Sequence, residues 1–158
     1  MVLEQIQKYF EKQQWVYSIN KDESDDSYVA SFNYKINNTV FSLFCEIYPD
    51  NHFIKLFIYA PNLVTQEKMA EALYLLNYIN SSRTGCVFVV VNDDQIRLQD
   101  FVKFTAEGVS DDALEYLFYS SFNLLYEYYP YILNLLISDT MAAEQIAMIS
   151  AVKSNRLN

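Results

Sequence analysis

Residues 65–129 carry the clearest secondary-structure signal in the chain and constrain its fold more than any other part. Apolar residues recur there first at helical spacing, then in two short runs on either side of residues 92–94, and then at helical spacing again. Ser110 precedes the second helical run and is a typical N-cap, because its hydroxyl can accept a hydrogen bond from the first turn of a helix. The pattern therefore predicts a helix, a β-hairpin and a long helix, in that order.

The residues before this segment predict a helix followed by an antiparallel meander. Apolar side chains at helical spacing predict a helix over residues 2–14. Four alternating apolar and polar stretches follow, separated by short turns, which favours neighbouring antiparallel strands. Pro61 and Asn62 are expected to end this part of the sheet. The four predicted strands lie near residues 15–20, 28–36, 41–47 and 54–58.

The middle helix and the hairpin complete the predicted sheet. Thr65 is expected to cap the helix, and residues 80–85 to close it with Gly85 in a left-handed conformation. Residues 86–91 are apolar on both faces, which predicts a strand that is covered on both sides or central in the sheet. The fold class is therefore α+β, an antiparallel sheet of about six strands flanked by helices in the order α-ββββ-α-ββ-α(-α). The predicted buried stripe of the middle helix is Met69, Ala72, Leu73, Leu76 and Ile79.

The long helix after Ser110 has two distinct faces. Its opposite, acidic side includes Tyr116, Tyr119 and Tyr126, which is unusual for a face exposed only to water. Two explanations stay open: neighbouring elements such as the first or last helix cover these tyrosines, or they form a dimer or partner-binding surface. Tyr116, Tyr119 and Tyr126 are therefore the candidate partner-binding residues. The predicted buried stripe is Leu114, Leu117, Phe118, Ser121, Leu124, Leu125 and Tyr128.

Pro130 is expected to kink or end this helix, because proline lacks the backbone donor for the carbonyl of Tyr126. A short helix is expected to restart at Ser138 or Asp139, and residues 154–158 are expected to form a frayed polar tail. The chain is thereby divided into residues 1–137, expected to form a single domain, and residues 138–158, a short C-terminal helix and polar tail.

Composition limits the classes of function. The chain has 158 residues, 52% of them hydrophobic and 20% charged, which suits one globular domain. Its formal net charge of −9, with scattered Lys and Arg, disfavours binding to nucleic acid or to an anionic membrane. The sequence shows neither a signal peptide nor an apolar run of membrane length, so a cytoplasmic protein is predicted. Cys45 and Cys86 fall in predicted strands and are expected to be buried thiols.

Few groups in the sequence could support catalysis. His52 is the only histidine and falls in a predicted turn, and two separated cysteines do not complete a zinc site. With only Gly85 and Gly108, no glycine-rich phosphate loop of the Walker or Rossmann type is possible. No catalytic, cofactor-binding or metal-ligating residues are therefore predicted, and no cofactor is expected. Scattered Glu, Asp and Tyr could still form an active site without a local signature.

The order of elements, together with four short motifs, resembles the YbjN family, described as "putative bacterial sensory transduction regulator". Residues 76–80, Leu-Asn-Tyr-Ile-Asn, are similar to the family's Leu-Asn-x-x-Asn at the end of the middle helix. Gly85 then leads into a strand, residues 108–110 precede the last long helix, and Tyr129-Pro130 lies late in it. The match spans residues 3–137. Many members have Asp-Gly in the second hairpin turn, where this chain has Asp93-Asp94.

This resemblance implies a fold shared with the type III secretion chaperones and a non-enzymatic module, often a homodimer in the chaperone branch. The favoured interpretation is a cytoplasmic protein-binding or regulatory domain. It would act through exposed aromatic or apolar surface, either at a sheet edge by strand addition or on the tyrosine face of the long helix. The alternative is a small-ligand-binding protein or enzyme with a pocket between the sheet and the long helix. A structural subunit of a larger assembly is a third option.

Overall fold

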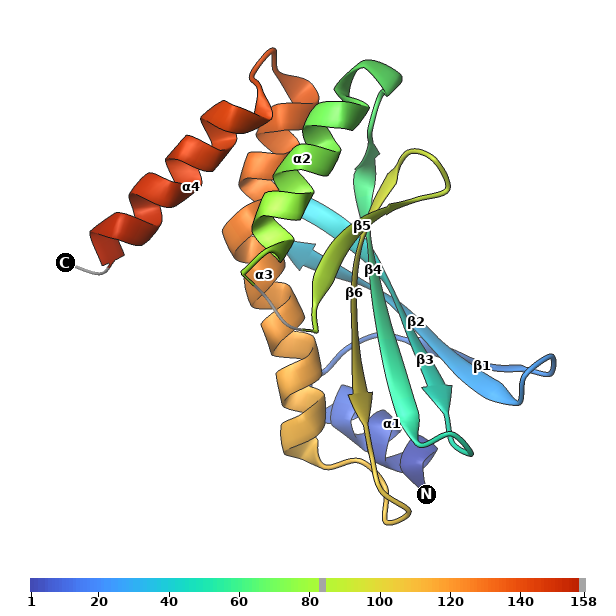
Figure 1. The fold of residues 1–158 in the computed structure, drawn as a ribbon. Coiled ribbons are helices and arrows are strands. Elements are labelled where there is room, and N and C mark those ends of the chain that lie inside the picture. Colours follow the sequence, from blue (N-terminus) through green and yellow to red (C-terminus); the bar gives the residue numbers. More distant parts are fainter. Residues whose placement is uncertain (83–84, 157–158) are drawn as a thin grey trace.

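A twisted antiparallel sheet with helices packed against one of its faces makes up the molecule (Figure 1). The computed structural model describes residues 1–82 and 85–156. The elements follow the predicted order and confirm the α+β class. Within the described residues they are α1 (Val2–Lys12), β1 (Ser18–Asp22), β2 (Ser27–Ile36), β3 (Thr39–Tyr48), β4 (Phe53–Leu63), the 3-10 helix η1 (Gln66–Lys68), α2 (Met69–Asn80), β5 (Val87–Val91), β6 (Gln95–Lys103), α3 (Asp111–Ile137) and α4 (Ala142–Arg156).

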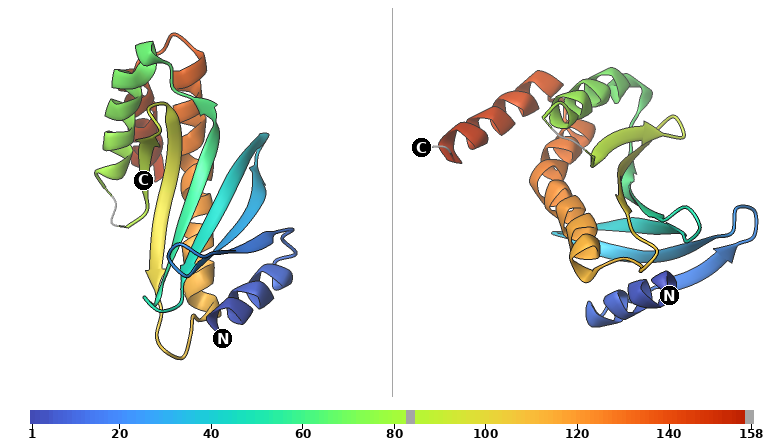
Figure 2. Two further views of the ribbon diagram at one scale, coloured as in Figure 1. Left: turned by 90° about the vertical axis from the view of Figure 1, so that its right-hand side faces the viewer. Right: turned by 60° about the horizontal axis from the view of Figure 1, so that its bottom comes forward.

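The strands lie in the order β1-β2-β3-β4-β6-β5, and every neighbouring pair is antiparallel. β1 to β4 form the predicted meander. The β5–β6 hairpin joins the sheet through β6, which pairs with β4, so β5 lies at the edge. Figure 2 shows the sheet curving around α3, which runs along its concave side.

The concave face of the sheet and the apolar stripe of α3 form the core. Alternate residues of β3 and β4 point inward, so that Leu43, Cys45 and Leu56 are fully buried. Every member of the predicted α3 stripe is buried as well. Its one polar member, Ser121, donates a hydrogen bond to the carbonyl of Leu117 at 2.8 Å, which satisfies the hydroxyl inside the core.

A cluster of aromatic rings fixes α1 against α3 and the sheet. The ring of Phe10 lies 5.5 Å from that of Phe118, and Trp15 stacks on Phe32 at 5.0 Å. Tyr17 packs edge-on against Phe10. This packing explains one correction: the first strand begins at Ser18 and not near Trp15, because Trp15 and Tyr17 belong to the connection that brings the cluster together.

The expectation that Pro61 and Asn62 end the fourth strand is wrong. β4 continues to Leu63, whose partner is Gln95 of β6. The register shifts between Tyr59 and Leu63, and Pro61 falls inside this irregular stretch. A bulge of this kind accommodates a proline, because the missing backbone donor no longer has to join the ladder of hydrogen bonds.

The start and the buried face of the middle helix also differ from the prediction. Thr65 precedes η1 and makes no side-chain cap, and α2 begins only at Met69. Leu73 is exposed and Leu75 is buried in its place. The true stripe of Ala72, Leu75, Leu76 and Ile79 follows the i, i+3, i+4, i+7 spacing of one helix face.

The β5–β6 hairpin corrects a further expectation. Gly85 has a φ of +97°, as predicted, whereas Arg83 and Thr84 of the predicted helix-closing segment lie outside the described residues. β5 is neither central nor covered on both sides, since Phe88 is its only buried residue. Asn92 and Asp93 in the turn have φ values of 51° and 70°, the positive pair that a type I′ hairpin turn requires.

The C-terminal part of the chain is more helical than predicted. α3 does not end at Pro130 but continues to Ile137, with Tyr129, Ile132 and Leu135 buried on either side of the proline. Packing of these residues offsets the lost backbone hydrogen bond. α4 is longer than the expected short helix, and residues 154–156 of the predicted frayed tail belong to it. Leu157 and Asn158 lie outside the described residues.

Candidate partner-binding surfaces

The convex face of the sheet is turned away from α3 (Figure 2, left). It presents a band of aromatic residues. We call this band the aromatic sheet face. Its rings are half-buried or exposed, and Phe101 keeps 56% of its surface exposed. They come from three adjacent strands, so they form one continuous patch. The band consists of Phe44 and Tyr48 of β3, Phe53, Phe57 and Tyr59 of β4, and Phe101 of β6.

The strand register explains why these rings meet. Phe53 lies opposite Tyr48 and Phe57 opposite Phe44 in the β3–β4 pair. The rings of Tyr48 and Phe53 stack with their centroids 4.5 Å apart, and Phe44 meets Tyr59 edge-on at 5.6 Å. Residues directly opposite in an antiparallel pair bring their side chains together, so alternating aromatic residues in both strands build a ring surface.

Cationic side chains lie between and above these rings. The ammonium of Lys55 is 4.8 Å from the ring centroid of Tyr48 and 5.2 Å from that of Phe53. The guanidinium of Arg97 is 4.3 Å from the Phe57 centroid and donates hydrogen bonds to the Tyr59 hydroxyl and the Gln99 side chain. Such contacts hold the cations flat against the sheet.

Two carboxylates lie close to this surface. Glu46 faces Lys55 across the strand pair and accepts a 2.7 Å hydrogen bond from Tyr48. Burial, followed by this hydrogen bond and the charge of Glu46, raises the pKa of Tyr48 above its ordinary value. Asp100 belongs to the opposite side of β6 and is 8% exposed. Burial raises the pKa of its carboxyl, and the backbone amide of Phe101 donates a 2.8 Å hydrogen bond to it.

A shallow groove of about 520 Å³ crosses the aromatic sheet face. We call it the sheet groove. Its walls combine aromatic rings with the cations of Lys55, Arg97 and Lys103. Such a surface can bind a ligand that is both apolar and negatively charged. The residues that line it are Phe53, Lys55, Phe57, Gly85, Arg97, Gln99, Asp100, Phe101 and Lys103.

The structure places the three predicted tyrosines along α3 without joining them into one cluster. Tyr116 and Tyr126 are 69% and 64% exposed. Tyr119 is less exposed, because its ring packs edge-on against Phe122 and its hydroxyl donates a hydrogen bond to Gln13 after α1. Gln13, just after the first helix, and Phe122 therefore cover Tyr119 in part, whereas Tyr116 and Tyr126 stay largely exposed.

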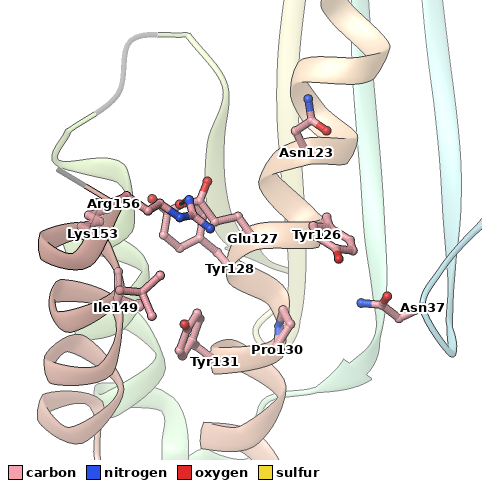
Figure 3. A pocket seen from close by; sticks show the side chains of 11 residues that line it. Asn37, Asn123, Tyr126, Glu127, Tyr128, Pro130, Tyr131, Ile149, Lys153 and Arg156 are labelled. Carbon is pink, nitrogen blue, oxygen red and sulfur yellow. Dashed lines mark ion pairs between the residues drawn. The ribbon is translucent and has the colours of Figure 1, made fainter. Parts of the chain in front are cut away.

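Tyr126 also borders a cleft of about 440 Å³ between α3 and α4 (Figure 3). We call it the α3–α4 cleft. Arg156 of α4 lies 3.5 Å from Glu127 of α3, and the Lys153 ammonium is 5.6 Å from the Tyr128 ring centroid. These contacts hold α4 beside α3. The lining residues are Asn37, Asn123, Tyr126, Glu127, Tyr128, Pro130, Tyr131, Ile149, Val152, Lys153 and Arg156.

The space between the sheet and α3 is occupied by core side chains. Leu56 and Leu98 from the sheet and Leu117 from α3 are at most 1% exposed. The sheet groove and the α3–α4 cleft open elsewhere on the molecule.

The only histidine and the two cysteines of the chain pack against other side chains of the protein. His52 stacks on the ring of Phe104, with centroids 5.5 Å apart. Cys45 and Cys86 are buried as predicted, and burial raises the pKa of the Cys45 thiol. Within residues 1–82 and 85–156, no group of three or more His, Cys, Asp or Glu is placed to hold a metal ion. Among the same residues, no helix has the length and apolar character needed to cross a membrane.

Comparison with known proteins identifies the family. A family model named YbjN, described as "Putative bacterial sensory transduction regulator", matches residues 3–134. The chain belongs to the YbjN family. No curated protein matches the sequence. The family description supports a regulatory or protein-binding role in general terms.

Two solved structures share the fold. One is the crystal structure of "YbjN, a putative transcription regulator from E. coli", with 12% identity and a TM-score of 0.53 over 85% of this chain and 88% of that chain. The other is an uncharacterized protein from Methanothermobacter thermautotrophicus, with 16% identity and a TM-score of 0.50 over 96% and 98% of the two chains. At these identities the similarity shows the YbjN fold alone.

The sequence predictions did not identify the aromatic sheet face, although a signal for it was present. The predicted strand over residues 54–58 is based on the alternating apolar residues Ile54, Leu56 and Ile58. The alternate positions Phe57 and Tyr59 are also aromatic. When an antiparallel strand is apolar on both sides, other elements must pack on both faces of the sheet, or one apolar face stays exposed to solvent. The YbjN fold leaves it open, because the helices lie on the concave side.

Proposed function

We propose that this chain is a non-enzymatic, chaperone-like regulatory domain of the cytoplasm that binds a protein partner through exposed aromatic surface. The observation that best supports this proposal is the aromatic sheet face. Its rings span three adjacent strands, and within the described residues no helix packs over them. Large contiguous apolar patches on monomers are typical of interaction sites. Membership of a family described as regulatory agrees with this interpretation.

A partner that covers the aromatic sheet face would remove apolar surface from water. A Phe or Tyr side chain buries roughly 150–250 Å² when it is fully covered, and apolar burial contributes about 25 cal/mol per Å². Covering the exposed part of Phe101, and smaller parts of its half-buried neighbours, therefore contributes several kcal/mol before the cost of association. The rings are already held by stacking and by Lys55 and Arg97, so little side-chain freedom remains to be lost.

The proposal includes a homodimer with a separate interface. Tyr116 and Tyr126 are ten positions apart on α3, which corresponds to about 15 Å along the helix axis. Both point away from the core and are largely exposed. A second copy that packs on this side of α3 would cover them, with Tyr119 at the margin. Tyr116, Tyr119 and Tyr126 thus remain the proposed partner-binding residues of α3.

The test is a binding measurement with matched variants. The tagged chain is used to recover its partner from cells of its own organism, and the purified partner is then titrated calorimetrically. A Phe57→Ser and Phe101→Ser double variant should weaken binding about tenfold or more, as expected when central aromatic contacts are removed. The control is Val16→Ser, which alters an exposed apolar side chain outside the aromatic sheet face.

Circular dichroism and thermal unfolding must show that both variants keep the fold. Equal affinity of the double variant and the wild-type chain would contradict a role for the aromatic sheet face. A comparable loss of affinity for the partner in Val16→Ser would show that the effect is not local to this face.

A further inference from the structure

The sheet groove has a charge opposite to that of the molecule. The chain carries 20 Asp and Glu against 11 Lys and Arg, yet three of the cations line this one groove. Asp100 also borders it, but its carboxyl is buried and accepts a hydrogen bond from the amide of Phe101. Glu46 lies outside the lining and is hydrogen-bonded to Tyr48. The groove is therefore a local cationic surface on an acidic protein.

Within the described residues the cations of the groove form no ion pair, although Glu46 faces Lys55 across the β3–β4 pair. Across residues 1–82 and 85–156, the ion pairs involve other cations, namely Lys12, Lys21 and Arg156. Arg97 donates to the neutral partners Tyr59 and Gln99. A carboxylate approaching from outside would thus find Lys55, Arg97 and Lys103 available, because their positive charges have no internal ion pair.

We propose that the sheet groove binds an extended acidic segment of the protein partner, with carboxylates placed over Lys55, Arg97 and Lys103 and an apolar side chain against Phe101. This inference rests on the proposed protein-binding function and specifies the chemistry of the bound segment. Its basis is charge complementarity between the groove and the segment.

The strand register sets the length of this segment. Arg97 and Lys103 are six positions apart on β6, a span of about 20 Å in a β-strand. Lys55 of β4 lies opposite Phe101, between these two ends. An extended chain of about seven residues covers this distance. Carboxylates near both ends and the middle of such a segment would each meet one cation.

The same contacts disfavour single-stranded nucleic acid as the occupant. Proteins that bind single strands offer exposed ring faces on which bases stack. Here the Arg97 guanidinium covers the ring of Phe57, and Tyr48 and Phe53 stack on each other beneath Lys55. The net charge of −9 would also repel a polyphosphate chain, whereas a short segment with few carboxylates is repelled less.

The experiment titrates the full chain with rhodamine-labelled ten-residue peptides and follows fluorescence anisotropy. One peptide alternates Glu with Phe and Leu, a second replaces every Glu by Gln, and a third probe is a ten-nucleotide oligothymidylate. We expect the Glu peptide to bind at least about tenfold more tightly than the Gln peptide at low salt, with the difference shrinking as salt screens the charges.

Charge-reversal variants locate the binding. Lys55→Glu and Lys103→Glu should each weaken binding of the Glu peptide about fivefold or more. Lys35→Glu, on β2 of the same sheet, is the control and should change the affinity less than about twofold. Equal affinity for the Glu and Gln peptides, a preference for the oligothymidylate, or equal effects of all three reversals would each overturn the inference. If these results occur while Phe57→Ser with Phe101→Ser still weakens partner binding, the proposed function stands and only the acidic segment is wrong.

Discussion

At the scale of single residues, the two glycines of the chain share a left-handed backbone but differ in their surroundings. Gly85 has a φ of 97° and Gly108 a φ of 105°. A side chain on Gly85 would meet only Asp100, at an ordinary contact distance of 3.7 Å. A side chain on Gly108 would collide with the carboxamide of Gln5, which accepts a 3.0 Å hydrogen bond from the amide of Val109.

This difference predicts unequal costs of substitution. Gly85→Ala should lose about 1 kcal/mol of unfolding free energy because of backbone strain alone. Gly108→Ala should lose at least about 1 kcal/mol more, because Gln5 must also abandon its hydrogen bond to Val109. Urea unfolding of both variants measures the two values. Equal losses would show that Gln5 moves aside without cost.

Asp100 should make stability depend on pH. Burial raises the pKa of its carboxyl in the folded protein, so the folded state keeps the proton to a higher pH than the unfolded chain does. Folding therefore takes up a proton between about pH 4 and the raised pKa, and this contribution to stability is lost as pH rises through that window. Asp100→Asn removes the titrating group and should make the fall of unfolding free energy with rising pH shallower.

Urea unfolding of wild type and Asp100→Asn at several pH values between roughly 4 and 7 checks this slope. Asn can still accept the hydrogen bond from the amide of Phe101, so the local structure should survive. Two parallel pH profiles would contradict the assignment of the slope to Asp100.

The sequence predicted residue roles well where local chemistry decides them. Ser110 caps α3 by accepting a hydrogen bond from Ala113, and Gly85 adopts a positive φ, as their types suggest. It predicted them poorly where tertiary contacts decide. Tyr119 and Tyr116 look alike in the sequence, yet Gln13 binds one and leaves the other exposed. No spacing rule within α3 contains this information.

At the scale of elements, α4 packs against two other helices, α2 and α3. It buries Ala142, Gln145 and Ile149 against α2 and α3, and the amide of its first residue donates a hydrogen bond to Glu71. The family model ends at residue 134, before α4 begins. The division of the chain after Ile137 stays a prediction.

A fragment of residues 1–137 tests this division. It should fold cooperatively, because the sheet, α1, α2 and α3 supply the aromatic cluster and the main core. It should be less stable than the full chain by about 2–4 kcal/mol, from the lost burial of Ile149 and neighbouring apolar surface. Thermal unfolding followed by circular dichroism measures the cooperativity of unfolding of the fragment and its stability relative to the full chain. An unfolded fragment would show that α4 belongs to the domain.

The order of helices and strands was predictable, because the spacing of the hydrophobic residues and the positions of the turn residues indicate it directly. Several features were not predictable, and three of them have a clear physical reason. Pro61 lies in a bulge of β4, Pro130 is tolerated inside α3 by buried neighbours, and the apolar β5 lies at an edge beside an aromatic face. In each case, local propensity predicted a break or a burial that packing of the whole sheet and helix overrides.

At the scale of the whole molecule, the proposed homodimer has a measurable mass. Light scattering coupled to size exclusion should give about twice 18.5 kDa for the wild-type chain. Tyr116→Glu combined with Tyr126→Glu should give the monomer mass, because two charges would be buried without partners at the interface. Tyr74→Glu, at an exposed tyrosine of α2, is the matched control and should remain dimeric. A monomeric wild-type chain, or dissociation of the control, would contradict the α3 interface.

The aromatic sheet face, with its cationic groove, is the proposed binding site of the protein partner. Site-specific photocrosslinking tests it most directly, with a photoreactive phenylalanine analogue at Phe101 or, as control, at Val40 near the far end of β3. Both positions are exposed. In cells, the analogue at Phe101 should form one covalent adduct, whose attachment site maps to an acidic segment of the partner. The analogue at Val40 should form none. Absence of an adduct from Phe101, or equal adducts from both positions, would contradict this binding site.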